Sequence, residues 1–226
     1  MTDISRIEQK YPVTLAQAES IRRRLTLFAQ EDPHNGTDGY WVRSVYFDTP
    51  DDRDHRDKRN GESCRQKVRL RVYGEEKTAK LELKEKLGAY QRKRSLTLNE
   101  AQAEAALRGD YGFLRDLEAG FAGELYLLLV TQCYRPKVLV SYRRRAYCVP
   151  ENDIRITFDG VLSTGPVEKS IPFRSPVLPV FAGGWLTLEV KYRDFLLSNL
   201  KLALGEGLLL QDSIGKYSLS RQALHM

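Results

Sequence analysis

Basic side chains recur at every second position along several short stretches of this 226-residue chain. In one stretch Lys67, Arg69 and Arg71 alternate with Val68 and Leu70. A period of two places like side chains on one face of a β-strand. Arginine binds phosphate oxygens through its paired N–H groups, and lysine adds a compact positive charge. Such a face can therefore bind a polyanion, and phosphate chemistry is the first candidate.

The same alternation occurs in four further stretches, in which carboxylates join the basic side chains. Their polar faces are Arg6, Glu8 and Lys10; Lys80, Glu82, Lys84 and Lys86; Arg155, Thr157 and Asp159; and Thr187, Glu189 and Lys191. Carboxylate oxygens are the ligands that hard divalent cations prefer, and such cations bridge phosphate oxygens. Glu189 and Glu8 are therefore the candidate metal ligands.

Two interpretations of these charged faces are open. In one, they are the solvated side of a sheet whose apolar faces form the core. In the other, helices cover the apolar faces, and the charged faces line the interior of a barrel. The excess of Arg and Lys favours the second, because exposed strands usually pair opposite charges. A basic interior repels itself unless an anion occupies it.

Strands and a few helices must position these residues. Capping boxes at Thr14 with Gln17 and at Asn99 with Gln102 predict two helix starts. Residues 194–204 and 114–133 are also expected to be helical, although the run 125–130 is compatible with a buried strand. Loops are expected at 30–39, 51–63 and 163–184, and Asp48 is expected to be a turn residue. The expected strands are Ile4–Tyr11, Ser44–Asp48, Gln66–Tyr73, Ala79–Leu87, Val138–Tyr147, Ile154–Val161 and Trp185–Tyr192.

The composition is that of a globular protein with anionic partners. The formal net charge is +6, and 42% of the residues are hydrophobic. We expect one domain over residues 1–226 and no secretory or membrane segment. The cysteines Cys64, Cys133 and Cys148 show no metal-binding spacing, so a reducing cytoplasmic location is expected.

Nine short motifs follow one another along the chain in an order that is more specific than any one of them. They are RIEQKY (6–11), VYFDT (45–49), KVRLRVY (67–73), LELKEK (81–86), RKR (92–94), SYRRRAY (141–147), RITFD (155–159), LEVKY (188–192) and GKYS (215–218). In this order they resemble the VTC domain of bacterial polyphosphate polymerases, within the triphosphate tunnel metalloenzyme (CYTH-like) superfamily.

The resemblance implies an α+β fold, in which a closed antiparallel eight-stranded β-barrel forms a tunnel with a charged lumen and flanking helices. It implies a metal-dependent phosphotransferase that moves the γ-phosphoryl group of ATP onto a growing inorganic polyphosphate chain, with Mn²⁺ or Mg²⁺ as cofactor. ATP and polyphosphate would be its partners, no nucleic acid is expected, and a membrane-protein partner is compatible with it.

The resemblance also assigns roles to single residues. Of the run Arg143–Arg145 only Arg144 is assigned to the lumen, and Gly215 stands where the family usually has serine. The RKR motif leaves open whether Arg92 or Lys93 is the tunnel base. Glu189 is the metal ligand, with Glu8 beside it. The catalytic clamp is Lys84, Arg69, Arg71, Arg144 and Arg155; the wider phosphate-binding set adds Lys10, Lys191 and Lys216.

Two other functions stay open. A hydrolase of the same architecture would cleave inorganic, nucleoside or thiamine triphosphate, since water can replace the acceptor phosphate. A non-catalytic binder of RNA or polyphosphate would use the basic faces alone. RNA binding usually places stacking aromatic side chains on the basic face, and few lie between the basic residues here.

Overall fold

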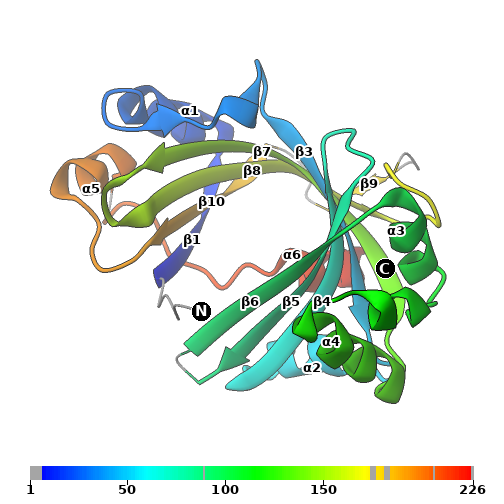
Figure 1. The fold of residues 1–226 in the computed structure, drawn as a ribbon. Coiled ribbons are helices and arrows are strands. Elements are labelled where there is room, and N and C mark those ends of the chain that lie inside the picture. Colours follow the sequence, from blue (N-terminus) through cyan, green and yellow to red (C-terminus); the bar gives the residue numbers. More distant parts are fainter. Residues whose placement is uncertain (1–6, 89, 174–176, 181–183, 206, 225–226) are drawn as a thin grey trace. The chain divides into compact units, whose positions relative to one another are not determined.

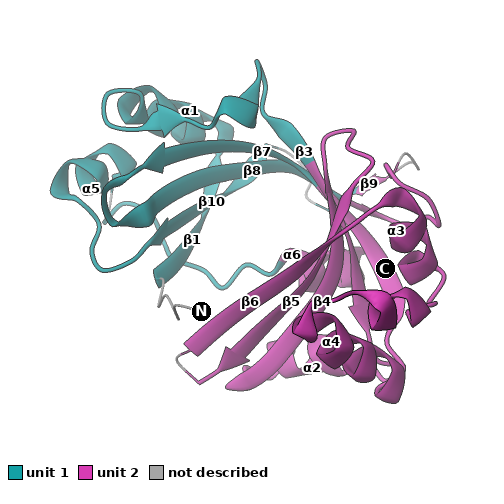
Figure 2. Cartoon of the chain, viewed as in Figure 1, with its two compact units in different colours: residues 1–41, 142–163, 179–215 teal, residues 42–141, 164–178, 216–226 magenta. Residues whose placement is uncertain are grey.

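The structure is a computed structural model that describes residues 7–88, 90–173, 177–180, 184–205 and 207–224. Residues 4–6 of the first expected strand, Arg6 among them, lie outside the described residues. The chain divides into two compact units (Figure 2). Unit 1 comprises residues 1–41, 142–163 and 179–215, and unit 2 comprises residues 42–141, 164–178 and 216–226. Each unit is built from segments far apart in sequence, and the single domain stays a prediction.

The described strands pair as one antiparallel sheet, drawn as arrows in Figure 1. Hydrogen-bonded neighbours follow the order β1-β10-β8-β7-β3-β4-β5-β6, while β2 pairs with β7 and β9 with β8. With the helices this makes the fold α+β, as expected. The strands are β1 (Ile7–Thr14), β2 (Gln30–Glu31), β3 (Tyr40–Asp48), β4 (Cys64–Tyr73), β5 (Ala79–Leu87), β6 (Tyr90–Leu98), β7 (Arg135–Val149), β8 (Ile154–Gly165), β9 (Leu178–Pro179) and β10 (Trp185–Tyr192).

The predicted closed barrel needs correction. Among the described residues, β1 and β6 are each paired along one edge only, so the sheet has two end strands. End strand β6 carries Arg92, Lys93 and Arg94 in succession, and charged side chains on an end strand disfavour further pairing. The antiparallel sheet is therefore confirmed, but its closure into a ring is not.

In unit 1 two helices cover the apolar face of the strands. Helix α1 (Leu15–Leu25) begins at the expected capping box, in which the Gln17 N–H donates to Thr14 Oγ1 at 3.2 Å. Helix α5 (Ser198–Leu204) begins four residues later than expected. The buried side chains of both helices form one core with apolar residues of four strands: Ala18, Ile21, Leu25, Leu200, Ala203 and Leu204 with Tyr11, Val13, Tyr147, Val149, Ile154, Ile156, Phe158, Leu188 and Val190.

In unit 2, helices α3 (Glu100–Leu107) and α4 (Gly120–Thr131) cover the apolar face of β4, β5 and β6. Residues 125–130 are thus helical rather than a strand. The shared core contains Ala103, Ala106, Leu107, Ala122, Leu125 and Leu129 with Val68, Leu70, Val72, Leu81, Leu83 and Leu98. The remaining helices are α2 (Arg53–Arg59), α6 (Lys216–Leu224) and the short 3₁₀ turns Pro33–Asn35, Gly112–Asp116 and Glu151–Asp153. None of the described helices is long and apolar enough to span a membrane.

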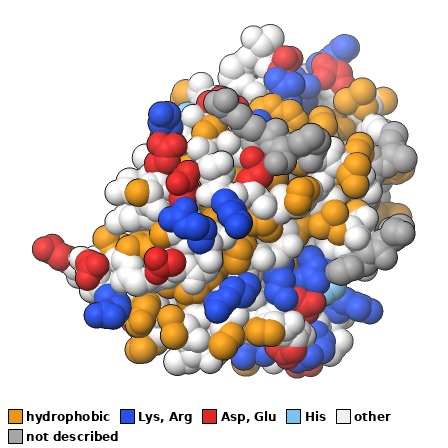
Figure 3. Space-filling view, turned by 90° about the vertical axis from the view of Figure 1, so that its right-hand side faces the viewer, with side chains coloured by type: hydrophobic (Ala, Val, Ile, Leu, Met, Phe, Trp, Pro, Cys, Tyr) orange, Lys and Arg blue, Asp and Glu red, His pale blue; other side chains and the backbone are white. Residues whose placement is uncertain are grey.

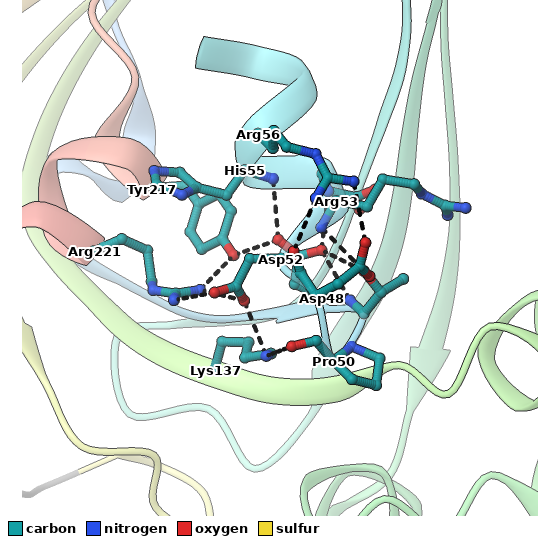
Figure 4. A network of polar contacts seen from close by, with 12 residues as sticks. Asp48, Pro50, Asp52, Arg53, His55, Arg56, Lys137, Tyr217 and Arg221 are labelled. Atoms are coloured by element: carbon teal, nitrogen blue, oxygen red, sulfur yellow. Dashed lines mark hydrogen bonds and ion pairs between the residues drawn. The ribbon is translucent and has the colours of Figure 1, made fainter. Parts of the chain in front are cut away.

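Two expectations from the sequence were wrong in this unit. Strand β6 was not foreseen, because consecutive basic residues hide the alternation of its side chains. The expected mobile loop 51–63 contains helix α2, whose start is held by a residue outside the loop. The buried carboxylate of Asp48 accepts the N–H groups of Thr49, Asp54 and His55 at 2.8, 2.9 and 3.0 Å. Asp48 therefore satisfies the first N–H groups of α2 and is more than a turn residue (Figure 4).

Asp54 is a second buried carboxyl group at the same helix start. It is 1% exposed, and the hydroxyl of Tyr134 lies 2.9 Å from both of its oxygens. Burial, reinforced by the negative charge of Asp48, raises the pKa of Asp54 to about 7. Below about pH 7 the protonated form of Asp54 is therefore favoured in the folded chain.

Packing of α4 on the sheet yields a stability prediction. Leu129→Ala removes a fully buried side chain and should lower the free energy of unfolding by about 2–5 kcal/mol. The matched control is Leu127→Ala on the same helix, whose side chain is 60% exposed and which should change stability little. Urea unfolding measures both variants, and equal losses would show that α4 does not pack as described.

Asp54 yields a prediction for the pH dependence of stability. Its pKa in the unfolded chain is about 3.9, so between about pH 4 and pH 7 the folded state binds a proton that the unfolded state does not. The contribution of Asp54 to stability therefore falls as the pH rises through this window. Asp54→Asn should flatten the decline in urea-unfolding free energy from pH 5 to pH 8, and the exposed control Asp116→Asn should keep it. Identical pH profiles for wild type and Asp54→Asn would contradict the assignment.

Candidate functional site

The charged face of unit 2 lies on the side of β4 and β5 opposite α3 and α4. The register pairs Arg69 with Glu82, Arg71 with Lys80 and Lys67 with Lys84, and directly paired residues share a face of the sheet. Their sequence neighbours on both strands are the leucines and valines of the helix-covered core. The placement of charged faces away from the helices, expected in the second interpretation of the sequence, is thus found in this unit.

Arg69 and Arg71 are held by specific partners on this face. Arg69 Nε donates to Glu82 Oε2 at 2.5 Å, and Arg71 Nε donates to Ser44 Oγ at 3.1 Å. Arg71 is 6% exposed, and Glu82 is fully buried. Burial alone would raise the pKa of Glu82, but Arg69 and Arg71 outweigh it and lower the pKa to about 2. Glu82 is therefore a permanent negative charge that orients the arginines.

The structure separates the two candidates of the RKR motif. Lys93 is paired with Lys84 across β5 and β6 and forms an ion pair with Glu82, so it shares the charged face. Arg92 is paired with Glu85 and donates to both of its oxygens at 3.0 and 3.1 Å. Because neighbouring residues of a strand point to opposite faces, Arg92 lies on the helix-covered side. Lys93 is therefore the residue of this motif that shares a face with Lys84, a residue of the predicted clamp.

Tyr46 on β3 also belongs to this face, although the sequence did not single it out. Its hydroxyl accepts a hydrogen bond from Arg69 Nη1 at 3.2 Å, and its ring stacks on Tyr217 of α6. Burial would raise the pKa of Tyr46, but Arg69, Arg71 and Lys67 outweigh it and lower the pKa to about 8. The alternation of Ser44 and Tyr46 within β3 is the signal that could have placed them.

Unit 1 carries a second charged face, in which lysines and glutamates alternate. Lys10 Nζ lies 3.1 Å from Glu8 Oε1 and 3.9 Å from Glu189 Oε1. Lys191 Nζ lies 3.3 Å from Glu189 Oε2 and 3.9 Å from Glu8 Oε2. The register of β1 and β10 places these four residues side by side. Both candidate metal ligands are thus brought together, each in contact with the same two lysines.

Two arginines flank this group. Arg144, 8% exposed, forms a two-pronged ion pair with Asp159 at 2.7 Å for both bonds, and its Nη2 lies 3.6 Å from Glu189 Oε2. Burial alone would lower the pKa of Arg144, but Asp159 and Glu189 raise it well above its usual value. Arg155 donates to Asp32 Oδ2 at 2.6 Å and to the hydroxyl of Tyr40 at 3.2 Å. Both predicted clamp arginines of this unit are therefore paired with carboxylates.

The charge balance of the two faces differs. Strands β4 to β6 carry Arg or Lys at 65, 67, 69, 71, 80, 84, 86 and 93 on the charged face, and Glu82 is the one carboxylate among them. In unit 1 the four cations Lys10, Arg144, Arg155 and Lys191 meet Glu8, Asp32, Asp159 and Glu189. Figure 3 shows Lys and Arg side chains, with Asp and Glu side chains between them, on the surface that faces the viewer. The strong positive excess is thus a property of the unit 2 strands.

The residues of unit 1 fit a divalent cation in part. No group of three or more His, Cys, Asp or Glu side chains in the described ranges is arranged to hold a metal ion. Glu8 and Glu189 nevertheless offer two carboxylates on one face, and Mg²⁺ is often bound by one or two carboxylates together with substrate phosphates and water. The pair is therefore compatible with a metal that arrives with a phosphate substrate.

Comparison with solved structures shows a shared fold. A candidate adenylate cyclase from Vibrio parahaemolyticus superimposes with a TM-score of 0.54 at 12% identity, over 96% of this chain and 98% of that one. A candidate adenylate cyclase from Bacillus halodurans gives 0.52 at 16% identity, over 94% and 96%. A Hippeastrum protein, described as a candidate adenylyl cyclase with a dominant triphosphatase activity, gives 0.54 at 12% identity, over 96% of both chains.

Comparison of the sequence itself defines the family. No curated protein matches the chain. The family model of the VTC domain matches residues 5–225, which include all nine motifs. The resemblance to the VTC domain predicted from the order of the motifs is confirmed: the chain shares its fold with these candidate cyclases and belongs to the VTC domain family.

Proposed function

We propose that the protein is a metal-dependent polyphosphate polymerase, which transfers the γ-phosphoryl group of ATP onto a growing phosphate chain. The observation that carries the proposal is the row of Arg and Lys on the charged face of unit 2, with Arg69 and Arg71 held in place by Glu82 and Ser44. Eight cations face one carboxylate here, whereas opposite charges usually pair across the strands of an exposed sheet. Such a row matches a linear chain of negative charges.

Phosphoryl transfer requires little covalent participation by the protein. The charge spread over the transferred group must be neutralised, and the donor and acceptor must be aligned. We assign Lys84, Arg69 and Arg71, with Lys93, to gripping the phosphates, and Lys216 to the same set. In unit 1 we assign Arg144 and Arg155 to phosphate binding through their guanidinium groups. Each is already oriented by a carboxylate, which limits the rearrangement needed when a phosphate binds.

Glu189 and Glu8 are proposed to hold a divalent cation, Mn²⁺ or Mg²⁺, which would screen the negative charge of the phosphates. Lys10 and Lys191 each form ion pairs with both Glu8 and Glu189, so they hold the two carboxylates close together. They also offer positive charge to the phosphate that shares the cation. Two observations support the metal-binding role: the closeness of Glu8 and Glu189, and membership of the VTC domain family.

Hydrolysis of a triphosphate is the second candidate. The Hippeastrum protein with this fold is described as having a dominant triphosphatase activity, and water can take the place of the acceptor phosphate. A non-catalytic nucleic-acid binder ranks behind both. Tyr46 and Tyr217 are buried and stacked on each other, so neither offers an open ring face for a base.

The products separate polymerase from hydrolase. The purified chain, incubated with ATP and Mn²⁺, should form long phosphate chains that are visible on a stained gel, with ADP released in proportion. Inorganic triphosphate offered alone should be hydrolysed slowly, because a polymerase transfers the phosphoryl group to a phosphate acceptor and not to water. Release of inorganic phosphate from triphosphate without chain formation from ATP would assign the protein to the hydrolases instead.

The role of Glu189 has a specific test. Glu189→Gln should lower Mn²⁺-dependent turnover by about 100-fold, an effect typical of a lost metal-site interaction. Tripolyphosphate should still bind, since Lys10, Lys191 and Arg144 remain. The matched control is Glu85→Gln, which removes a half-buried, arginine-paired carboxylate from the helix-covered side of β5 and should leave turnover unchanged. Full turnover in Glu189→Gln would remove this residue from the site.

A further inference from the structure

Tyr217 connects a buried anchor of unit 2 to its charged face. Its hydroxyl donates to Asp48 Oδ2 at 2.7 Å and accepts from Arg221 Nη1 at 3.2 Å. Tyr217 is 1% exposed, and Asp48 is fully buried. These bonds and the burial give the tyrosine ring one position, near the start of α2 (Figure 4).

The anchor itself is rigid. Asp48 accepts three backbone N–H groups from residues 49–55 in addition to the Tyr217 hydroxyl. A carboxylate bound by four donors has little freedom to rotate. Arg221, one turn after Tyr217, donates to both oxygens of Asp52 at 2.9 and 2.7 Å, and Lys137 Nζ lies 2.9 Å from Asp52 Oδ1. Helix α6 is therefore bound to the rest of unit 2 through the carboxylates of Asp48 and Asp52.

The ring of Tyr217 continues this contact toward the phosphate-binding strands. It is stacked on the ring of Tyr46, with centroids 4.8 Å apart and planes inclined by 14°. The guanidinium carbon of Arg69 lies 5.9 Å from the centre of the Tyr46 ring, and its Nη1 donates to the Tyr46 hydroxyl. Asp48, Tyr217, Tyr46 and Arg69 thus form one continuous chain of contacts.

We propose that Tyr217 is a positioning residue, which holds Arg69 in its phosphate-binding orientation through the ring and hydroxyl of Tyr46. The inference rests on the proposed function, because it assigns Tyr217 to the phosphate site of that function. A guanidinium binds phosphate through two parallel N–H groups only when its plane is correctly turned. Glu82 holds the Nε side of Arg69, and Tyr46 holds Nη1. Without the Tyr217 ring, Tyr46 loses its stacking partner, and one of these two supports is weakened.

The test measures binding of inorganic tripolyphosphate to the full chain by calorimetry. Tyr217→Leu removes the ring and should weaken binding on the order of tenfold, as expected when one charge-assisted hydrogen bond is lost. Tyr217→Phe keeps the stacked ring but loses the hydroxyl that binds Asp48, so it should weaken binding less than Tyr217→Leu does. Tyr46→Phe keeps the stack but removes the hydroxyl that accepts from Arg69, and should weaken binding as Tyr217→Leu does.

The matched control is Tyr111→Phe. Tyr111 is 3% exposed in the same unit, and its hydroxyl donates to the Tyr134 carbonyl oxygen at 2.7 Å, so its loss removes a comparable buried bond away from the charged face. Thermal unfolding of each variant checks the fold, and Tyr46→Phe decides the question if Tyr217→Leu does not fold. The inference is overturned if Tyr46→Phe binds like wild type, or if Tyr217→Leu binds like Tyr111→Phe. A wild-type chain that does not bind tripolyphosphate would instead overturn the proposed function, and this inference with it.

Discussion

Packing of helices on one face of the strands is the constraint on which the rest of this structure depends. Side chains of a strand alternate between two faces, so burying Leu70 or Leu188 under a helix places Arg69 or Glu189 on the other side. A slip of one residue in register would exchange the two sets completely. The charged faces are therefore positioned by apolar contacts, and the stability of the helix-covered cores is what keeps the cations aligned.

Charge in these faces is balanced in two different ways. In unit 1 each buried or half-buried cation has a carboxylate partner, as in the pairs Arg144 with Asp159 and Arg155 with Asp32. On the charged face of β4 to β6 a single carboxylate, Glu82, is shared by Arg69 and Lys93. Like charges at close range repel one another, and an anionic ligand offsets that repulsion. The excess of positive charge thus marks the unit 2 face as the stronger candidate for holding phosphates.

Residues outside the charged faces contribute to their geometry. Asp48 is the last residue of β3, binds N–H groups at the start of α2 and accepts a hydrogen bond from α6, so one carboxylate joins two neighbouring elements to a helix near the end of the sequence. Tyr217 in turn stacks on Tyr46, whose hydroxyl accepts a hydrogen bond from Arg69. The family motifs VYFDT and GKYS therefore meet in space, which gives a physical reason for their appearing in one chain.

The sequence by itself determined the local elements and their faces. Period-two alternation placed Arg69, Arg71, Lys84, Arg155 and Glu189 on strand faces opposite apolar residues, because the pleat of a strand depends only on neighbouring residues. Capping boxes likewise located the starts of α1 and α3. Only the tertiary structure decided which charged groups meet, which of Arg92 and Lys93 shares the face of Lys84, and that residues 53–59 are helical. The side of Lys93 depends on the register of β5 with β6, and the start of α2 depends on hydrogen bonds to the buried carboxylate of Asp48. The bond from Tyr217 to Asp48 joins residues 169 positions apart, and no local pattern records such a contact.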